Sequence, residues 1–127
     1  MSPLLDPVRL DELIHDVGLE VLMILMEDFL ATDYETPLHT LSVQRAEARR
    51  DCLHGLKGVA ANMGALSLFL LSRDLMKQTC LTEKDQDHII AVLLETRQAM
   101  NEWINNAPPP DPETDEPDEN RSAGGFL

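Results

Sequence analysis

The sequence is poor in aromatic residues, cysteines and basic residues. Aromatic residues make up 4% of the 127 positions, so a core must be built from leucine, valine, isoleucine, methionine and alanine. Cys52 and Cys80 are too few for a disulfide framework, and we expect reduced thiols in a cytoplasmic protein. Only 10 Lys and Arg stand against 23 Asp and Glu, and the net charge of −13 argues against nucleic acid or an anionic membrane as partner.

Long apolar runs and nucleotide-binding motifs are also lacking. The most apolar stretch, residues 17–30, is interrupted by three acidic residues and is too short to span a bilayer. The N-terminus lacks the basic-then-apolar layout of a signal peptide. Glycine-rich phosphate loops and other nucleotide-binding motifs are absent, which argues against an ATP-binding kinase domain, and no Ser-His-Asp pattern is present.

What the sequence does contain is helical periodicity. We expect helices over residues 6–16, 19–32, 46–63, 65–80 and 82–105, and no strand alternation competes with them. Short connections favour antiparallel neighbours. We therefore predict an all-α protein, an antiparallel four-helix bundle with a short N-terminal accessory helix. The residues expected to point inward from the fourth of these helices are Leu66, Phe69, Leu70 and Leu75.

Start and stop signals support these boundaries. Asp6-Pro7 is typical of a helix start, Thr82 to Asp85 resembles a capping box, and Gly64 is placed to end a helix. Thr36-Pro37 is a second start signal. It is compatible with a kink in one long helix or with a separate helix that runs to about Val43.

The composition changes at Asn106. Residues 107–127 contain five of the eight prolines and six acidic residues against one arginine, so they cannot bury enough apolar surface to fold. We expect a helical domain over residues 1–106 and a disordered Pro/acid-rich tail over 107–127. The tail is either a solvated segment without specific function or a device that tunes partner choice by charge repulsion.

His54 stands in the most informative run of the chain. At about 100° per residue, it points roughly 140° from the centre of an apolar stripe and therefore toward water. Gly58 and Ala61 lie on the same side as His54, with Gly55 nearby. The stripe itself consists of Leu53, Leu56, Ala60 and Met63.

The two glycines beside His54 need an explanation. Each interior glycine costs a helix about 1 kcal/mol relative to alanine. Bare backbone around one imidazole indicates that a partner must approach it closely. Arg50 and Lys57 flank His54 at i−4 and i+3, so the group suits a nucleophile that accepts an anion such as phosphate.

The run Leu53-His54-Gly55-Leu56-Lys57-Gly58, followed by Gly64-Ala65, resembles the signature of histidine phosphotransfer (HPt) domains. The likeness extends over residues 6–105 and includes the leucine-rich helix before the motif. It implies that His54 takes a phosphoryl group from an aspartate of one receiver domain and gives it to another. It also implies that Lys57 offsets the phosphoryl charge and that Gly58 leaves room for the partner.

The resemblance implies partners as well. We expect response-regulator receiver domains and hybrid sensor kinases of two-component phosphorelays, and a monomeric cytoplasmic phosphocarrier without enzymatic activity. We expect no cofactor, the divalent metal being held by the receiver domain. Many HPt domains carry a glutamine on the following helix, where this chain has Met76, with Gln78 two residues on. A helical adaptor that docks a receiver without transferring phosphate is therefore the alternative.

The spacing Glu12-x-x-His15 is the one that di-iron bundles use. Such sites need two Glu-x-x-His pairs and two further glutamates that face the core, and the sequence has no second pair. Asp51-x-x-His54 and Asp85-x-x-His88 share only the spacing. We therefore predict no metal site in this chain.

Overall fold

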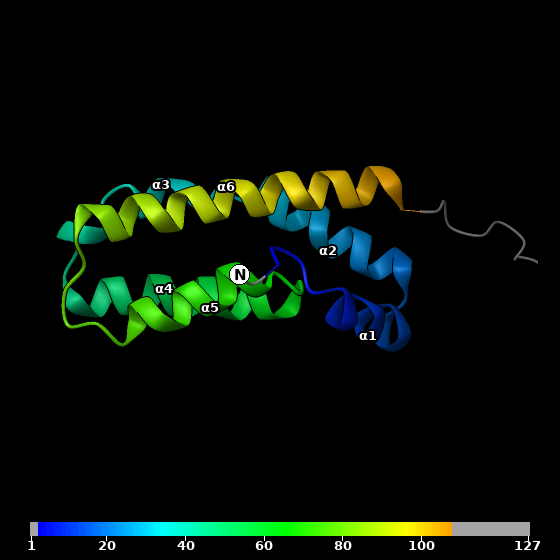
Figure 1. The fold of residues 1–127 in the computed structure, drawn as a ribbon, viewed down its shortest axis with the longest axis horizontal. Helices are drawn as coiled ribbons and strands as arrows, with labels where there is room; N and C mark the ends of the chain where they lie inside the picture. The colour runs from blue at the N-terminus through cyan, green and yellow to red at the C-terminus, as the bar shows by residue number, and fades with distance from the viewer. Residues whose placement is uncertain (1–2, 108–127) are drawn as a thin grey trace, which may run out of the picture.

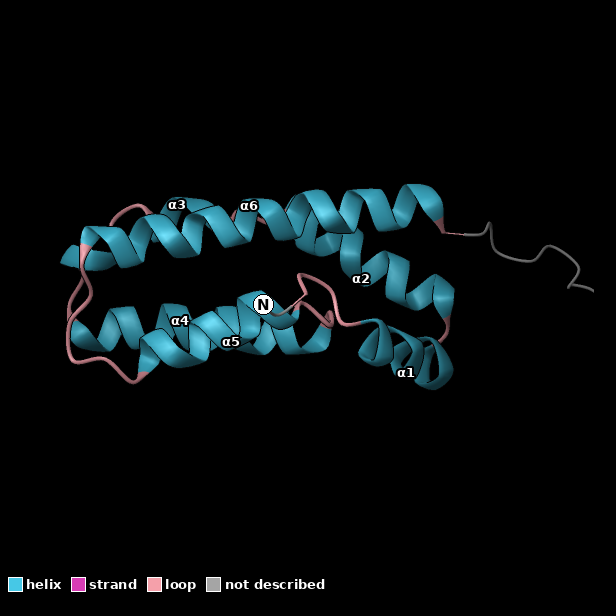
Figure 2. Ribbon diagram, in the orientation of Figure 1, coloured by secondary structure: helices cyan, strands magenta, loops and turns pink. Residues whose placement is uncertain are grey.

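The computed structural model describes residues 3–107, and every regular element in that range is helical (Figures 1 and 2). The all-α prediction is thus confirmed, while the predicted tail lies outside the described residues from position 108 onward. The elements in chain order are α1 (Pro7–Val17), α2 (Leu19–Ala31), α3 (Glu35–Leu38), the 3₁₀ turn η1 (Leu41–Val43), α4 (Ala46–Asn62), α5 (Leu66–Met76) and α6 (Glu83–Asn106).

Helices α4 and α5 form a hairpin, and α5 packs against the long helix α6 (Figure 1). On its other side, α6 contacts α2, α3 and η1, while α1 packs on α2. Figure 1 shows α6 and α3 along one side of the molecule and the α4–α5 hairpin along the other. Within the described residues, α6 makes the most extensive contact with the hairpin, and the start of α1 contacts the turn between α4 and α5.

The core is built almost entirely from aliphatic residues, as the composition predicts. Among the described aromatic residues only Phe29 is buried, and its ring stacks on Tyr34 with the centroids 5.0 Å apart. The other large side chains with the least exposure are Leu22, Met26, Leu38, Leu41, Leu53, Leu68, Ile89, Leu93 and Met100. They come from every long helix except α1.

The predicted start and stop signals are confirmed at three places. The carboxylate of Asp6 accepts the backbone N–H of Val8 at 3.0 Å, at the start of α1. Thr82 and Asp85 form the capping box at the start of α6, each side chain accepting the other's backbone N–H. Gly64 follows the end of α4 with a φ of +69°, a conformation that side chains with a Cβ adopt reluctantly.

The segment around Thr36-Pro37 forms a separate short helix, not a kink in a longer one. The start signal is Asp33, whose carboxylate accepts the N–H groups of Glu35 and Thr36 at 3.1 and 3.0 Å. This turn satisfies the first donors of α3, which then runs for only four residues. Gln86 of α6 holds the following segment, donating to the carbonyl of His39 at 2.8 Å.

One prediction for α5 is wrong, and another is confirmed only in part. The helix ends at Met76, four residues before the expected Cys80, and the carbonyl of Thr79 instead accepts the guanidinium of Arg49 at 2.8 Å. Of the four residues expected to point inward, Leu75 is buried and Phe69 packs half-buried against the core, whereas Leu66 and Leu70 are not part of the core cluster. The helix is apolar on several faces, so its periodicity does not fix which face points inward. Its buried positions are Leu68, Ser72 and Leu75, while Leu66, Phe69 and Leu70 are half-buried.

Candidate functional site

His54 lies on the solvent side of α4, opposite the residues that anchor this helix. Leu53, Leu56 and Ala60 are buried, and so is Met63 just beyond the helix end. His54 itself is exposed. The predicted apolar stripe and the predicted exposure of the imidazole are both confirmed.

Gly55 and Gly58 leave the backbone around His54 uncovered. Both are exposed, and a Cβ atom placed on either would have no neighbour within 4 Å. Both also have φ values outside the positive range, so neither packing nor backbone conformation requires glycine here. Each glycine costs the helix about 1 kcal/mol relative to alanine. The two glycines therefore lower the stability of the helix and leave an open surface beside His54.

The predicted cations near His54 are available to an anion. Lys57 is half-buried and Arg50 is exposed, and within residues 3–107 neither forms an ion pair with a carboxylate. Arg49, by contrast, is buried and donates to the carbonyl of Thr79. The two arginines therefore differ in role: Arg49 ties α4 to the segment after α5, whereas Arg50 faces solvent.

A pocket of about 300 Å³ lies where α1 meets the α4–α5 hairpin. Val8 of α1, Ala61 of α4 and Phe69 of α5 contribute to its lining, and Val8 is 65% exposed. The backbone N–H of Asp6 donates to the carbonyl of Gly64 at 2.8 Å, which fixes the start of α1 against the hairpin turn. Because Ala61 is two turns after His54 on the same side of α4, this pocket continues the surface around the histidine.

The same pocket shows which part of α5 lies beside His54. Ala61 shares the pocket with Phe69 and Leu66. His54 lies seven residues before Ala61, and in an antiparallel hairpin the matching positions lie seven residues further along α5. These positions are Arg73 and Met76, which places both level with His54.

Arg73 is a residue that the sequence analysis missed. It is exposed, and its guanidinium pairs with the neighbouring Asp74 at 3.1 Å. Its spacing of three residues before Met76 could have indicated it, because the two share one edge of α5. Met76 is half-buried against the core, whereas Gln78 lies beyond the helix end.

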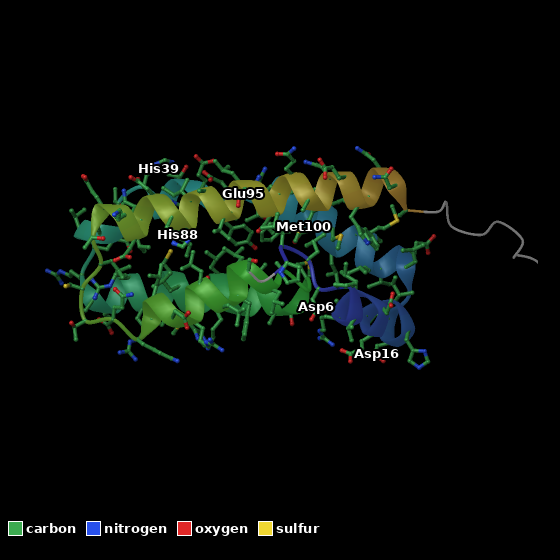
Figure 3. All side chains as sticks on the ribbon, viewed as in Figure 1. Asp6, Asp16, His39, His88, Glu95 and Met100 are labelled. Atoms are coloured by element: carbon green, nitrogen blue, oxygen red, sulfur yellow. The ribbon has the colours of Figure 1, made fainter. Side chains whose placement is uncertain are left out.

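The other three histidines lie on different elements and do not share a site. His39, just after α3, pairs with Glu35 at 2.9 Å, and His88 is exposed on α6 (Figure 3). His15 is exposed on α1. No group of three or more His, Cys, Asp or Glu side chains that could hold a metal ion occurs in residues 3–107. The Glu-x-x-His and Asp-x-x-His spacings thus create no such cluster in this part of the chain.

Both cysteines are free thiols. Cys52 is half-buried on α4, and this burial raises the pKa of its thiol, whereas Cys80 is exposed between α5 and α6. A raised pKa disfavours the reactive thiolate form of Cys52.

No protein-family model, curated protein or solved structure matches this chain. Within the described residues, no helix has both the length and the apolar character that a membrane crossing requires. What points to a function is therefore the geometry of α4 and its surroundings, together with the motif around His54.

Proposed function

We propose that this chain is a histidine phosphocarrier of the HPt type, which shuttles a phosphoryl group between receiver-domain aspartates through His54. The observation that carries the proposal is an exposed imidazole beside two glycines whose missing side chains leave open space. On this proposal α2, α4, α5 and α6 form the antiparallel four-helix bundle, and α1 is the accessory helix. The protein acts as a cytoplasmic monomer.

The transfer is a nucleophilic displacement at phosphorus. A neutral imidazole, protonated at Nδ1, attacks the phosphoryl group of an aspartyl phosphate through Nε2 of His54. The N–P bond forms as the bond from phosphorus to the aspartate oxygen breaks, and the carboxylate leaves. An imidazole is partly neutral near pH 7, so no dedicated base is needed, and the reverse reaction follows the same path.

The protein supplies position and charge. Phosphoryl transfer depends on in-line geometry and on neutralising the charge of the transferred group. Lys57 and Arg50 bring positive charge to within one helical turn of His54, and Arg73, which pairs with Asp74, is level with it by the register of α5. The receiver domain holds the divalent metal, and this chain needs no cofactor of its own.

The docking surface extends from His54 over Gly58 to the pocket formed by Val8 and Ala61. This surface is apolar near α1 and bare near the histidine, so a receiver domain reaches the imidazole without displacing any side chain. Response regulators and hybrid sensor kinases both carry such domains and are the proposed partners.

A non-transferring adaptor is the second candidate, and Met76 favours it. This side chain has no donor or acceptor strong enough to orient an imidazole, and it packs against the core beside His54. An adaptor would dock a receiver through the same surface without becoming phosphorylated.

Phosphotransfer from receiver domains separates the two candidates. The chain is mixed with a panel of receiver domains that carry radiolabelled phosphate, and the label is followed onto wild type, His54→Gln and His15→Gln. We expect an acid-labile, base-stable phosphoprotein with wild type and His15→Gln, and none with His54→Gln. Label on His54→Gln refutes the assignment. A complex that forms without any label on wild type supports the adaptor.

A further inference from the structure

A groove of about 710 Å³ lies along the junction of α5 and α6, and nothing in the proposed phosphotransfer uses it. Its walls come from these two helices and from Leu4, and no lining residue belongs to α4. Ser67 donates through its hydroxyl to the carbonyl of Pro3 at 2.8 Å, so the N-terminal segment closes one end. The groove is therefore a surface separate from that of His54.

The α6 wall has the spacing of a helix-packing seam. Five of its six lining residues recur at alternating intervals of four and three, and this stripe is about 21 Å long at 1.5 Å per residue. In chain order the five are His88, Val92, Glu95, Ala99 and Glu102, of which Figure 3 labels His88 and Glu95. The sixth, Gln98, donates through its amide to the carboxylate of Glu102 at 3.3 Å. The facing wall of α5 supplies Leu70 and Leu71. Such a seam fits one further helix of about four turns.

The charge along the groove indicates what kind of helix fits. The apolar floor is bordered by Asp74, Glu95 and Glu102, and no lysine or arginine lines it. Arg73 pairs with Asp74, but within residues 3–107 no cation pairs with either glutamate. The two glutamates lie seven residues apart, one heptad, on the same stripe.

We propose that the α5–α6 groove binds an amphipathic helix of a partner protein that carries lysine or arginine at heptad spacing beside its apolar stripe. Apolar side chains of this helix cover Leu70, Val92 and Ala99, while its cations meet Glu95 and Glu102. A second copy of this chain, with a net charge of −13, and its own acidic segment 107–127 both bring like charge to these carboxylates. The inference stands whether or not His54 accepts phosphate.

The test uses a designed tryptophan-free helical peptide of about 18 residues, with leucine and alanine on one stripe and lysine beside it. A second peptide has the same composition in scrambled order. Binding to the full-length chain is followed by backbone amide NMR shifts and by the fluorescence of Trp103, the single tryptophan, which is adjacent to Glu102. We expect shifts concentrated on the groove residues.

Substitutions in the protein distinguish the groove from general charge attraction. Glu95→Lys with Glu102→Lys should weaken peptide binding about tenfold, and the milder pair Glu95→Gln with Glu102→Gln should weaken it less. Glu27→Lys on α2, an exposed control with the same change of charge per site, should alter binding less than about twofold.

Four results overturn the proposal. The first two are equal binding of the scrambled peptide and an equal loss of binding with Glu27→Lys. The third is a nuclear Overhauser contact between Phe126 and Val92 in the free chain, which identifies the chain's own segment as the occupant. The fourth is a concentration-dependent dimer of the free chain that the Glu95→Gln, Glu102→Gln pair abolishes.

Discussion

The middle of α4 and its C-terminal end use glycine in opposite ways. Gly55 and Gly58 have open space where a Cβ would lie and helical backbone that any residue can adopt. Gly64 has a φ of +69°, and a Cβ there would lie 3.3 Å from Cδ2 of Leu10. The first two glycines lower the stability of the helix, whereas the third is required by the turn that joins α4 to α5.

The contrast shows how a glycine needed for folding differs from one that exposes a surface. Replacing a glycine that the backbone needs should destabilise the fold. Replacing one that the backbone does not need should stabilise it, and any loss of activity then reports on the surface. The two kinds of glycine lie within ten residues of each other, so stability and phosphotransfer can be measured on closely matched variants.

The largest effect is expected from Gly64→Val. A β-branched residue at positive φ is strained, and its Cβ crowds Leu10, so the free energy of unfolding should fall by about 2–3 kcal/mol. Gly64→Asn, which tolerates the left-handed region, should cost less than half as much. Urea unfolding followed by circular dichroism measures both, and equal stability of wild type and Gly64→Val would contradict the role given to this turn.

Gly55→Ala and Gly58→Ala should act in the opposite direction. Each should raise the free energy of unfolding by about 0.5–1 kcal/mol, because alanine is the better helix former and its methyl group meets open space. Each should also slow transfer from a phosphorylated receiver, by up to about tenfold for the pair, because the methyl groups stand between His54 and its partner.

The reverse substitution provides the control for these alanines. Ala91 is exposed within α6 and lies outside the α5–α6 groove, so Ala91→Gly should lower stability by a similar amount and leave transfer unchanged. If Gly55→Ala and Gly58→Ala transfer phosphate at the rate of wild type, the bare surface is not needed for docking.

A smaller effect is expected from the cations around His54. Lys57→Ala and Arg73→Ala should each slow transfer by up to about fivefold, because exposed charges contribute little once salt screens them. Lys84→Ala, an exposed cation at the start of α6, is the matched control and should leave the rate unchanged. An Arg73→Ala variant that behaves as this control would place Arg73 outside the site.

Much of the molecule follows from local patterns in the sequence. The helix boundaries at Asp6, Gly64 and Thr82 depend on caps that short motifs encode, and the exposure of His54 depends on periodicity within one helix. These features need no knowledge of which helix packs against which. The interior glycines of α4 are visible for the same reason, since their cost is a property of the helix alone.

The features that sequence reasoning missed depend on packing between helices. The sequence does not indicate which face of α5 points inward, because the apolar residues Leu66, Leu68, Phe69 and Leu70 form no single stripe. That Arg73 is level with His54 follows only from the register of the hairpin, and the carbonyl of Thr79 is held by Arg49 from another helix. The α5–α6 groove likewise exists only once the two helices are placed side by side.

The smallest effect is expected at Asp33, a residue outside α4 whose substitution should change stability and leave phosphotransfer unchanged. The carboxylate of Asp33 accepts hydrogen bonds that lower its pKa. The largest contribution comes from the hydroxyl of Thr36, and smaller ones come from the backbone N–H groups of Thr36 and Glu35. A lowered pKa means that the ionised carboxylate stabilises the fold above its unfolded pKa of about 3.9, and that this contribution is lost as the pH falls through the folded value.

Asp33→Asn should therefore be slightly less stable than wild type at pH 7, and the difference should shrink toward zero in the acid range. Urea unfolding at a series of pH values measures this difference. Phosphotransfer at pH 7 should be unchanged, and a slower rate would mean that α3 contributes to docking.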